Sequence, residues 1–350
     1  MEESDEDEED NEEFLERLMA RTGQEVPQQE LEDHYAVLEE LGSGTYGRVV
    51  LTEPRDGGSA VVLKLLLKEK TSRQGFLREY CIGRCLAGHG ACLRALPLAF
   101  ETATHFAFAQ ELAPAGDLCA LLSPGEGLAE ELVKRCAQQL AQALDFMHSH
   151  GLVHRDVKLD NVLLFDPQCQ RVKLGDFGLT RVQGSPVGAM SGTLPYAPPE
   201  LCQLQGSEML ELDSSLDVWA FAVLLFCLCT GCFPWALAAS SDPQFQDFSA
   251  WQEGVEGQGV PVAWQSFSSG ALEMFQRLLQ LDPDRRSPAM EVQKYLALPW
   301  LATASATEVP PSSPQSPLSG GIRESPGGSG GMGGADGVLM PPASALAPCW

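Results

Sequence analysis

Apolar side chains recur along this 350-residue chain in three patterns, and each pattern predicts a different element. Between residues 128 and 148 they return at steps of three and four residues, so they share one face of an amphipathic helix. Residues 218–229 are an unbroken apolar run of 12 residues, too short to span a bilayer. Residues 61–63 are a short apolar strand run that ends in the charge of Lys64. The amphipathic face comprises Leu132, Val133, Cys136, Leu140, Leu144 and Met147.

The two ends of the chain differ in composition from the middle. Residues 1–33 hold 15 acidic residues and two arginines, a balance typical of a solvated, disordered arm. Residues 302–350 are rich in Pro, Gly and Ser and cannot build a core, so we expect a disordered tail. Within the acidic arm, a brief apolar stripe from Phe14 to Met19 predicts a marginal helix, or a segment that docks on the N-terminal part of the folded domain or on a partner.

The net charge of −25 argues against binding to nucleic acid or to an anionic membrane. The eleven cysteines are an odd number, scattered through apolar segments, and no signal peptide or transmembrane segment is recognisable. We therefore expect reduced thiols and an intracellular, cytoplasmic protein. The six histidines form no ligand cluster.

Candidate chemistry is concentrated between residues 154 and 178, where the chain reads HRDVKLDNVLLFDPQCQRVKLGDFG. Two carboxylates, Asp156 and Asp176, share this loop–strand–loop span with Lys158 and Asn161. Phosphoryl transfer needs such a set. One acid orients the acceptor hydroxyl, a cation offsets charge on the moving group, and an amide and a second acid hold Mg²⁺. The segment therefore predicts a phosphoryl-transfer site.

The spacing of these residues resembles the catalytic loop and the metal-binding loop of protein kinases. That resemblance requires a glycine-rich turn, a strand lysine and a helical glutamate about 100 residues earlier. Residues 41–49 read LGSGTYGRV and fit G-x-G-x-x-G-x-V. Lys64 ends the apolar strand run, and Glu79 lies in the predicted helix over 75–87, where it is expected to pair with Lys64.

The resemblance also implies a role for each polar residue. Gln110 is expected to guard the pocket behind the adenine, Asp117 to meet the ribose, and the backbone near Glu111 and Ala113 to hydrogen-bond the adenine. The expected catalytic residues are Asp156, Lys158 and Asn161, and the expected Mg²⁺ ligands are Asn161 and Asp176. The expected contacts with ATP are Leu41, Gly42, Ser43, Gly44, Thr45, Tyr46, Gly47, Val49, Val62, Lys64, Glu79, Gln110, Glu111, Ala113, Asp117, Leu163 and Asp176.

The downstream sequence extends the resemblance. Residues 192–200 read GTLPYAPPE and are similar to the end of a kinase activation segment. In that family the closing glutamate, here Glu200, pairs with an arginine near the end of the domain, and Arg286 stands at the matching place. The apolar run 218–229 corresponds to the buried central helix of the large lobe.

The resemblance implies an α+β fold, two-lobed and protein-kinase-like, over residues 34–301. A β-rich small lobe is expected over 34–113 and a mainly helical large lobe over 114–301, with ATP between them. The acidic arm 1–33 and the Pro/Gly/Ser-rich tail 302–350 then flank this domain.

Two residues resemble those of serine/threonine kinases. Lys158, two residues after the catalytic aspartate, and Thr193 in the activation segment both follow that subclass. Several stretches are similar to the SH3-binding-domain kinase family, namely residues 75–80, 109–112, 151–154 and 232–235. The expected partners are protein substrates with Ser or Thr acceptors. An SH3-domain protein at the P-x-x-P spacing of 310–317 is suggested mainly by this resemblance, because no basic residue flanks that segment closely.

The alternative is a pseudokinase, a scaffold that binds other proteins and transfers nothing. Completeness of the polar set separates the two, and here every member is present, which favours an active enzyme. Two departures weaken the support: Pro198 replaces the usual alanine before Pro199, and Gly83 stands where kinases place an apolar side chain against Phe177. A third, Val62 in place of the usual alanine, narrows the adenine slot.

Arg155, next to the catalytic aspartate, needs a counter-charge when the activation segment closes. Residues 179–197 contain no acid but include Ser185 and Ser191. The sequence thus predicts that a phosphate on one of these serines pairs with Arg155 and orders the segment.

Overall fold

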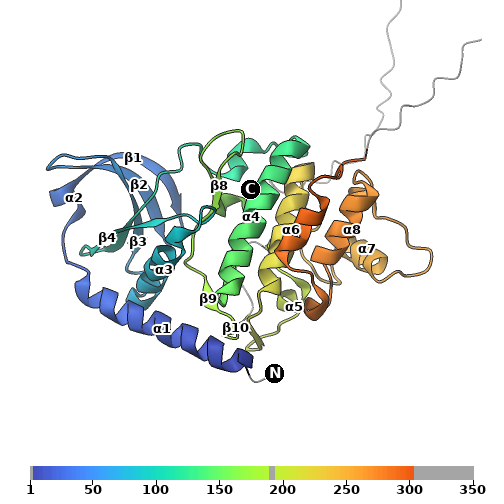
Figure 1. Cartoon of the computed structure of the whole chain (residues 1–350), viewed down its shortest axis with the longest axis horizontal. Helices are drawn as coiled ribbons and strands as arrows, with labels where there is room; N and C mark the ends of the chain where they lie inside the picture. The colour runs from blue at the N-terminus through green and yellow to red at the C-terminus, as the bar shows by residue number, and fades with distance from the viewer. Residues whose placement is uncertain (1–2, 189–193, 303–350) are drawn as a thin grey trace, which may run out of the picture. The chain divides into compact units, whose positions relative to one another are not determined.

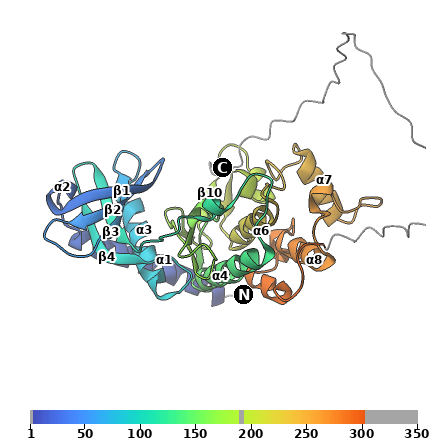
Figure 2. The ribbon, with the colours of Figure 1, turned by 90° about the horizontal axis from the view of Figure 1, so that it is seen from above.

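A computed structural model of the chain describes the fold of residues 3–188 and 194–302, and side chains from residue 11 onward (Figure 1 and Figure 2). None of the helices in these ranges is both long enough and apolar enough to cross a membrane. The tail that follows residue 302, with its P-x-x-P segment, lies outside the described residues.

The small lobe is a five-stranded antiparallel sheet with one helix against it. The strands lie in the order β1-β2-β3-β5-β4. Helix α3 (Arg73–Cys85) stands between β3 and the edge strand β4 in the chain. Helix α3 begins at an N-cap, Ser72, whose side chain accepts the N–H of Gly75, and its Phe76 stacks on Phe106 with ring centroids 4.8 Å apart. The strands are β1 (Tyr35–Gly44), β2 (Gly47–Pro54), β3 (Val61–Leu67), β4 (Ala95–Glu101) and β5 (His105–Gln110).

The large lobe is built around two packed helices, α4 (Glu130–Ser149) and α6 (Ser215–Thr230). The predicted apolar face of α4 is buried, with Leu132 partly so, and every residue of α6 from Ser215 to Cys229 is buried. Helices α5 (Pro199–Cys202), α7 (Pro243–Gln252) and α8 (Ser269–Leu278) complete this lobe. Its short strands are β6 (Leu152–Val153), β7 (Val162–Leu164), β8 (Val172–Leu174), β9 (Arg181–Val182), β10 (Pro186–Gly188) and β11 (Met209–Glu211).

The expectation of a disordered acidic arm is wrong for the residues that the structure describes. Helix α1 (Glu3–Glu25) packs along α3, and Leu15 and Met19 are each only 5% exposed in the main core. The following residues include the short helix α2 (Leu31–His34). An acidic helix is marginal in water, but burial of its apolar stripe against a neighbour stabilises it. The apolar stripe therefore docks on the small lobe, which was one of the two alternatives predicted for it.

Candidate active site

The glycine-rich turn joins β1 to β2 at the open edge of the sheet. Leu41, Gly42, Ser43 and Gly44 end β1, Thr45 and Tyr46 form the turn, and β2 starts at Gly47. Of the three glycines, only Gly47 is demanded by packing, because a Cβ there would lie 1.9 Å from the carbonyl oxygen of Leu65. A Cβ on Gly42 or Gly44 would meet nothing within 4 Å.

Lys64 on β3 and Glu79 on α3 form the ion pair that the sequence predicts. The Nζ of Lys64 lies 2.6 Å from Oε1 of Glu79 and 3.0 Å from Oδ1 of Asp176. Burial disfavours the lysine charge, but the two carboxylates outweigh burial and raise the pKa of Lys64. Lys64 in turn lowers the pKa of Asp176, against the opposing effect of burial. Carboxylates from α3 and from the loop after β8 thus meet at the ammonium group of Lys64 on β3.

In the catalytic loop, Lys158 and Asn161 both contact Asp156. The Nζ of Lys158 lies 2.8 Å from Oδ2 of Asp156, and the side-chain amide of Asn161 donates to that same oxygen at 2.9 Å. Asn161 also donates to the backbone carbonyl of Asp156 at 2.8 Å. Burial disfavours the charge of Lys158, but hydrogen bonding to Asp156 overrides it and raises its pKa. The carboxylate of Asp156 is therefore fixed between a cation and an amide.

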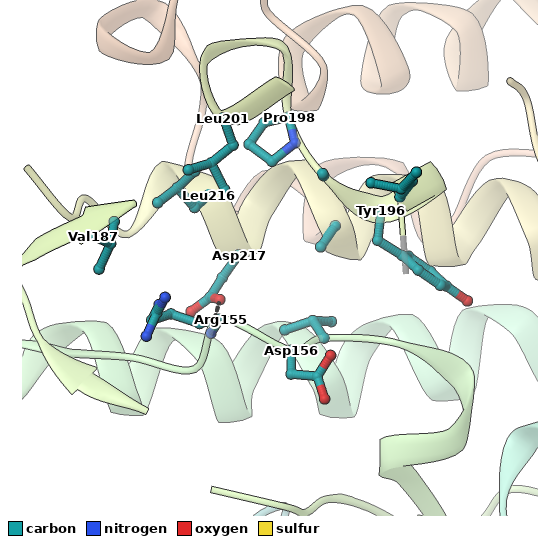
Figure 3. Close-up of a pocket in the computed structure, with 12 residues that line it drawn as sticks. Arg155, Asp156, Val187, Tyr196, Pro198, Leu201, Leu216 and Asp217 are labelled. Carbon is teal, nitrogen blue, oxygen red and sulfur yellow. Dashed lines mark hydrogen bonds between the residues drawn. The ribbon is translucent and has the colours of Figure 1, made fainter. Parts of the chain in front are cut away.

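Asp217, in the first turn of α6 just before the predicted apolar run, holds this loop in shape. The buried carboxylate of Asp217 accepts the backbone N–H of His154 at 2.7 Å. It also accepts the backbone N–H of Arg155 at 2.8 Å (Figure 3). Nε2 of His148 lies 2.9 Å from the same carboxylate. Arg155 and Asp176 both have left-handed backbone, with φ of 70° and 59°, which costs energy for residues other than glycine. Asp217 is thus the anchor that keeps the strained Arg155 in place.

His154 connects the two loops. Its ring Nδ1 accepts the N–H of Asp156 at 3.2 Å, so the Nε2–H is left to donate to the carbonyl of Gly175 at 2.9 Å. Gly175 donates in turn to the backbone carbonyl of Asn161 at 2.8 Å. These bonds fix the spacing between the catalytic loop and Asp176.

The predicted adenine contacts lie at the end of β5 and in the segment after it, which joins the lobes. Val62 pairs with Gln110 in the β3–β5 register, and the backbone N–H of Glu111 donates to the carbonyl of Arg94 at 3.1 Å. The carboxylate of Glu111 bonds the buried Lys173, so it belongs to the scaffold. Ala113 lies in the connecting segment that follows.

Asp117 and Leu163 lie at the floor of this region. They form a backbone bridge that ties the connecting segment to β7. Oδ1 of Asp117 accepts the N–H of Ala120 at 3.2 Å, and partial burial raises its pKa.

Gly83 lacks the apolar side chain that kinases place against Phe177, and the neighbouring strand β4 fills this space. A Cβ on Gly83 would lie 3.0 Å from Cβ of Ala95 on β4 and 3.7 Å from the ring of Phe177. The side chain of Ala95 is small, and this allows β4 to approach the backbone of Gly83. Phe177 is 4% exposed and makes an edge contact with His154.

A pocket lies between the catalytic loop and the end of the activation segment (Figure 3). Asp156 faces it from one side and Pro198 and Leu201 from the other, with Val187 and Leu216 in the same wall. Pro198 precedes helix α5 in extended backbone, which suits proline, so the departure from the usual alanine introduces no strain. Ser191, Gly192 and Thr193 lie outside the described residues.

The residues present fit a divalent cation that also binds phosphate. Among residues 3–188 and 194–302, no cluster of three or more His, Cys, Asp or Glu side chains could hold a metal alone. The side chain of Asp176 is 47% exposed. The amide nitrogen of Asn161 donates to Asp156, so the amide oxygen of Asn161 is left as a possible metal ligand. Two oxygen ligands are what Mg²⁺ takes from a protein when nucleotide phosphates and water supply the rest.

Comparison with known proteins identifies the family. The protein kinase domain model matches residues 35–301. The chain is 47% identical to serine/threonine-protein kinase SBK1 of Mus musculus over 81% of this chain and 68% of that protein. It is 45% identical to SBK1 of Danio rerio over 82% and 74%, and 34% identical to meng-po of Drosophila melanogaster over 81% and 62%. The chain therefore belongs to the protein kinase family and, within it, to the SH3-binding-domain kinases.

Proposed function

We propose that the chain transfers the γ-phosphoryl group of Mg·ATP to serine and threonine hydroxyls of protein substrates. The observation that carries this proposal is the contact of Lys64 with both Glu79 and Asp176, at 2.6 and 3.0 Å. Protein kinases need the lysine–glutamate pair and the metal-binding aspartate in place together. That closed arrangement favours an enzyme over a pseudokinase scaffold.

Each polar residue has a task in this mechanism. Asn161 and Asp176 would hold Mg²⁺, which would neutralise charge on the phosphates. Lys64 holds the nucleotide tail, and Glu79 keeps Lys64 in position. Asp156, fixed by Asn161, orients the acceptor hydroxyl, and Lys158 offsets negative charge on the moving phosphoryl group.

The nucleotide contacts follow from the same geometry. The N–H of Glu111 already donates to Arg94, so we assign the carbonyl of Glu111 and the N–H of Ala113 to the adenine. Asp117 is assigned to the ribose and Gln110 to the rear of the adenine pocket. The glycine-rich turn covers the phosphates, since Gly42 and Gly44 leave open space beside the backbone.

The substrate class is supported only at its coarsest level, protein acceptors with Ser or Thr. Exposed Asp160, close enough to Asp117 to raise its pKa, favours basic side chains near the acceptor. The SH3-domain partner at 310–317, the cytoplasmic location and the absence of nucleic-acid and membrane partners stay predictions from sequence.

The test is phosphorylation of a degenerate peptide library by the purified full-length chain. We expect wild type to phosphorylate Ser and Thr peptides, and Lys64→Met and Asp156→Ala to lose at least about 100-fold. Lys70→Met and Asp247→Ala remove the same side chains at exposed positions and serve as matched controls. Equal signals from wild type and both site variants would reveal a contaminating kinase and favour the scaffold.

A further inference from the structure

Helix α1 is anchored to the small lobe along most of its length. Leu15 and Met19 are buried against α3, and Sγ of Cys81 on α3 bonds Oγ1 of Thr22 at 3.6 Å. At the end of α1, the guanidinium of Arg73 donates to the carbonyl of Gly23 at 2.6 Å. The chain then forms a bridge to β4, where Glu101 exchanges backbone hydrogen bonds with both Pro27 and Gln29 at 2.9 Å.

The other end of α1 reaches the base of the activation segment. Helix α1 contacts β9, which pairs with β6 immediately before the catalytic loop (Figure 1). A Cβ on Gly151, next to β6, would lie 3.0 Å from the side-chain nitrogen of Asn11. One helix therefore touches the small-lobe helix that carries Glu79 and the large-lobe strands that flank Asp156.

Three arginines converge where these elements meet. They are Arg78 on α3, Arg155 in the catalytic loop and Arg181 on β9. Arg155 donates to the carbonyl of Leu179 at 3.2 Å, and Arg181 donates to that of Thr180 at 2.7 Å. The guanidinium groups of Arg155 and Arg181 thus bind the backbone of residues 178–180, which follows Asp176 and Phe177. Burial, followed by the charges of Arg78 and Arg155, lowers the pKa of Arg181 to about 10.

Such a cluster needs a negative charge, and Glu12 on α1 is positioned to supply it. Oε1 of Glu12 lies 3.3 Å from Nη2 of Arg78, and only 13% of the Arg78 side chain is exposed. Glu12 also acts on Arg181, in the direction opposite to the neighbouring arginines. The two acids nearest Arg155 are already engaged: Asp217 binds two backbone N–H groups and His148, and Asp156 binds Lys158 and Asn161.

We propose that Glu12 is a positioning residue that neutralises the Arg78–Arg155–Arg181 cluster, so that α1 holds α3 and the activation segment in the active arrangement without a phosphate. Glu79 follows Arg78 directly on α3, so fixing Arg78 also fixes the partner of Lys64. The competing source of charge is the phosphate predicted on Ser185 or Ser191. This inference rests on the kinase activity proposed above.

The test compares Glu12→Gln with Glu13→Gln in the full-length chain. Glu13 is the neighbouring acid, 66% exposed and paired only with Arg17 of the same helix among the described residues. We expect kcat to fall about tenfold in Glu12→Gln and to stay unchanged in Glu13→Gln, with equal melting temperatures. The exchanged pair Glu12→Arg with Arg78→Glu should regain most of the loss. Wild type treated with a phosphatase should keep its activity.

A second measurement does not depend on turnover. Hydrogen exchange of the amides of residues 178–182 should become faster in Glu12→Gln and stay unchanged in Glu13→Gln. If the two variants behave alike in both measurements, or if phosphatase treatment inactivates wild type, the inference is wrong. An inactive wild type whose exchange still responds to Glu12→Gln alone would defeat the proposed function and leave this contact standing.

Discussion

Glu200 binds Arg286 through two parallel hydrogen bonds, 2.8 Å from Nη1 to Oε1 and 3.1 Å from Nη2 to Oε2. The Arg286 side chain is fully buried, donates to the carbonyl of Ser215 at 2.8 Å and lies over the ring of Trp219. Glu200 and Arg286 are 86 residues apart in sequence, and through Arg286 the end of the activation segment is tied to the first turn of α6.

Replacing Arg286 should therefore destabilise the large lobe. Arg286→Met leaves Glu200, whose side chain is only 15% exposed, as a largely desolvated charge without its partner, and we expect the free energy of unfolding to fall by about 3 kcal/mol. Chemical denaturation measures this loss. Arg285→Met, at the exposed neighbouring position, should change stability by less than about 0.5 kcal/mol. Equal effects of the two substitutions would contradict the role of the pair.

The apolar stripe of α1 should contribute to stability in proportion to its burial. Leu15→Ala should lower the free energy of unfolding by about 2–5 kcal/mol, because Leu15 is 5% exposed in the main core. Phe14→Ala is the matched control, since Phe14 is 54% exposed on the same helix. A disordered arm would instead make both substitutions neutral.

Gly83 and Ala95 should behave as a complementary pair. Gly83→Leu places a large side chain where a Cβ already lies 3.0 Å from Ala95 and 3.7 Å from Phe177, so we expect Phe177 to be displaced and peptide phosphorylation to fall at least about 100-fold. Gly88→Leu, at a position with nothing within 4 Å of its Cβ, is the control and should retain activity. Full activity of Gly83→Leu would mean that β4 can move away without cost.

Asp217 should stabilise the fold only while its carboxylate is charged. Burial acts to raise its pKa, but hydrogen bonding to His148 and the nearby histidines outweigh burial and lower the pKa below the usual 3.8. A lowered carboxyl pKa gives stability that is complete above about pH 4 and is lost as the pH falls through the folded-state value. Asp217→Asn should cost about 2–4 kcal/mol in urea unfolding at pH 7. The difference in unfolding free energy between wild type and Asp217→Asn should become smaller toward pH 3. A difference of the same size at pH 7 and pH 3 would show that the charge of Asp217 is not its source.

Peptide preference should depend on Asp160. Asp160→Asn removes an exposed negative charge within the catalytic loop, so the preference for Lys or Arg near the acceptor should weaken by a few-fold while turnover on a neutral peptide is kept. Asp247→Asn on α7 is the control. An unchanged library profile in Asp160→Asn would place the source of any basic preference elsewhere.

Much of the catalytic centre was predictable because its residues belong to short segments with fixed spacing. Asp156, Lys158 and Asn161 lie within six residues, and the pairing of Lys64 with Glu79 follows from one strand and one helix. Features that depend on tertiary contacts could not be predicted from the sequence. Local charge in residues 1–33 indicates disorder, and only the complementary surface of α3 makes the helix stable.

The contact between Gly83 and Ala95 was missed for a related reason. Each small residue alone suggests a cavity, and their complementarity appears only when α3 and β4 are in place. The double acceptance of backbone N–H groups by Asp217 could have been sought from its place at the start of the buried helix, where a carboxylate must find donors.

The bridge between residues 27–29 and Glu101 has a practical consequence for anyone preparing the catalytic region alone. The family match begins at residue 35, so a recombinant fragment cut at that boundary would lack both the bridge and α1. Leu77, which lies close to Gly23, and Cys81, which bonds Thr22, would become more exposed, and β4 would present an uncovered edge for self-association. Expression from residue 3 or earlier should yield the better-behaved sample.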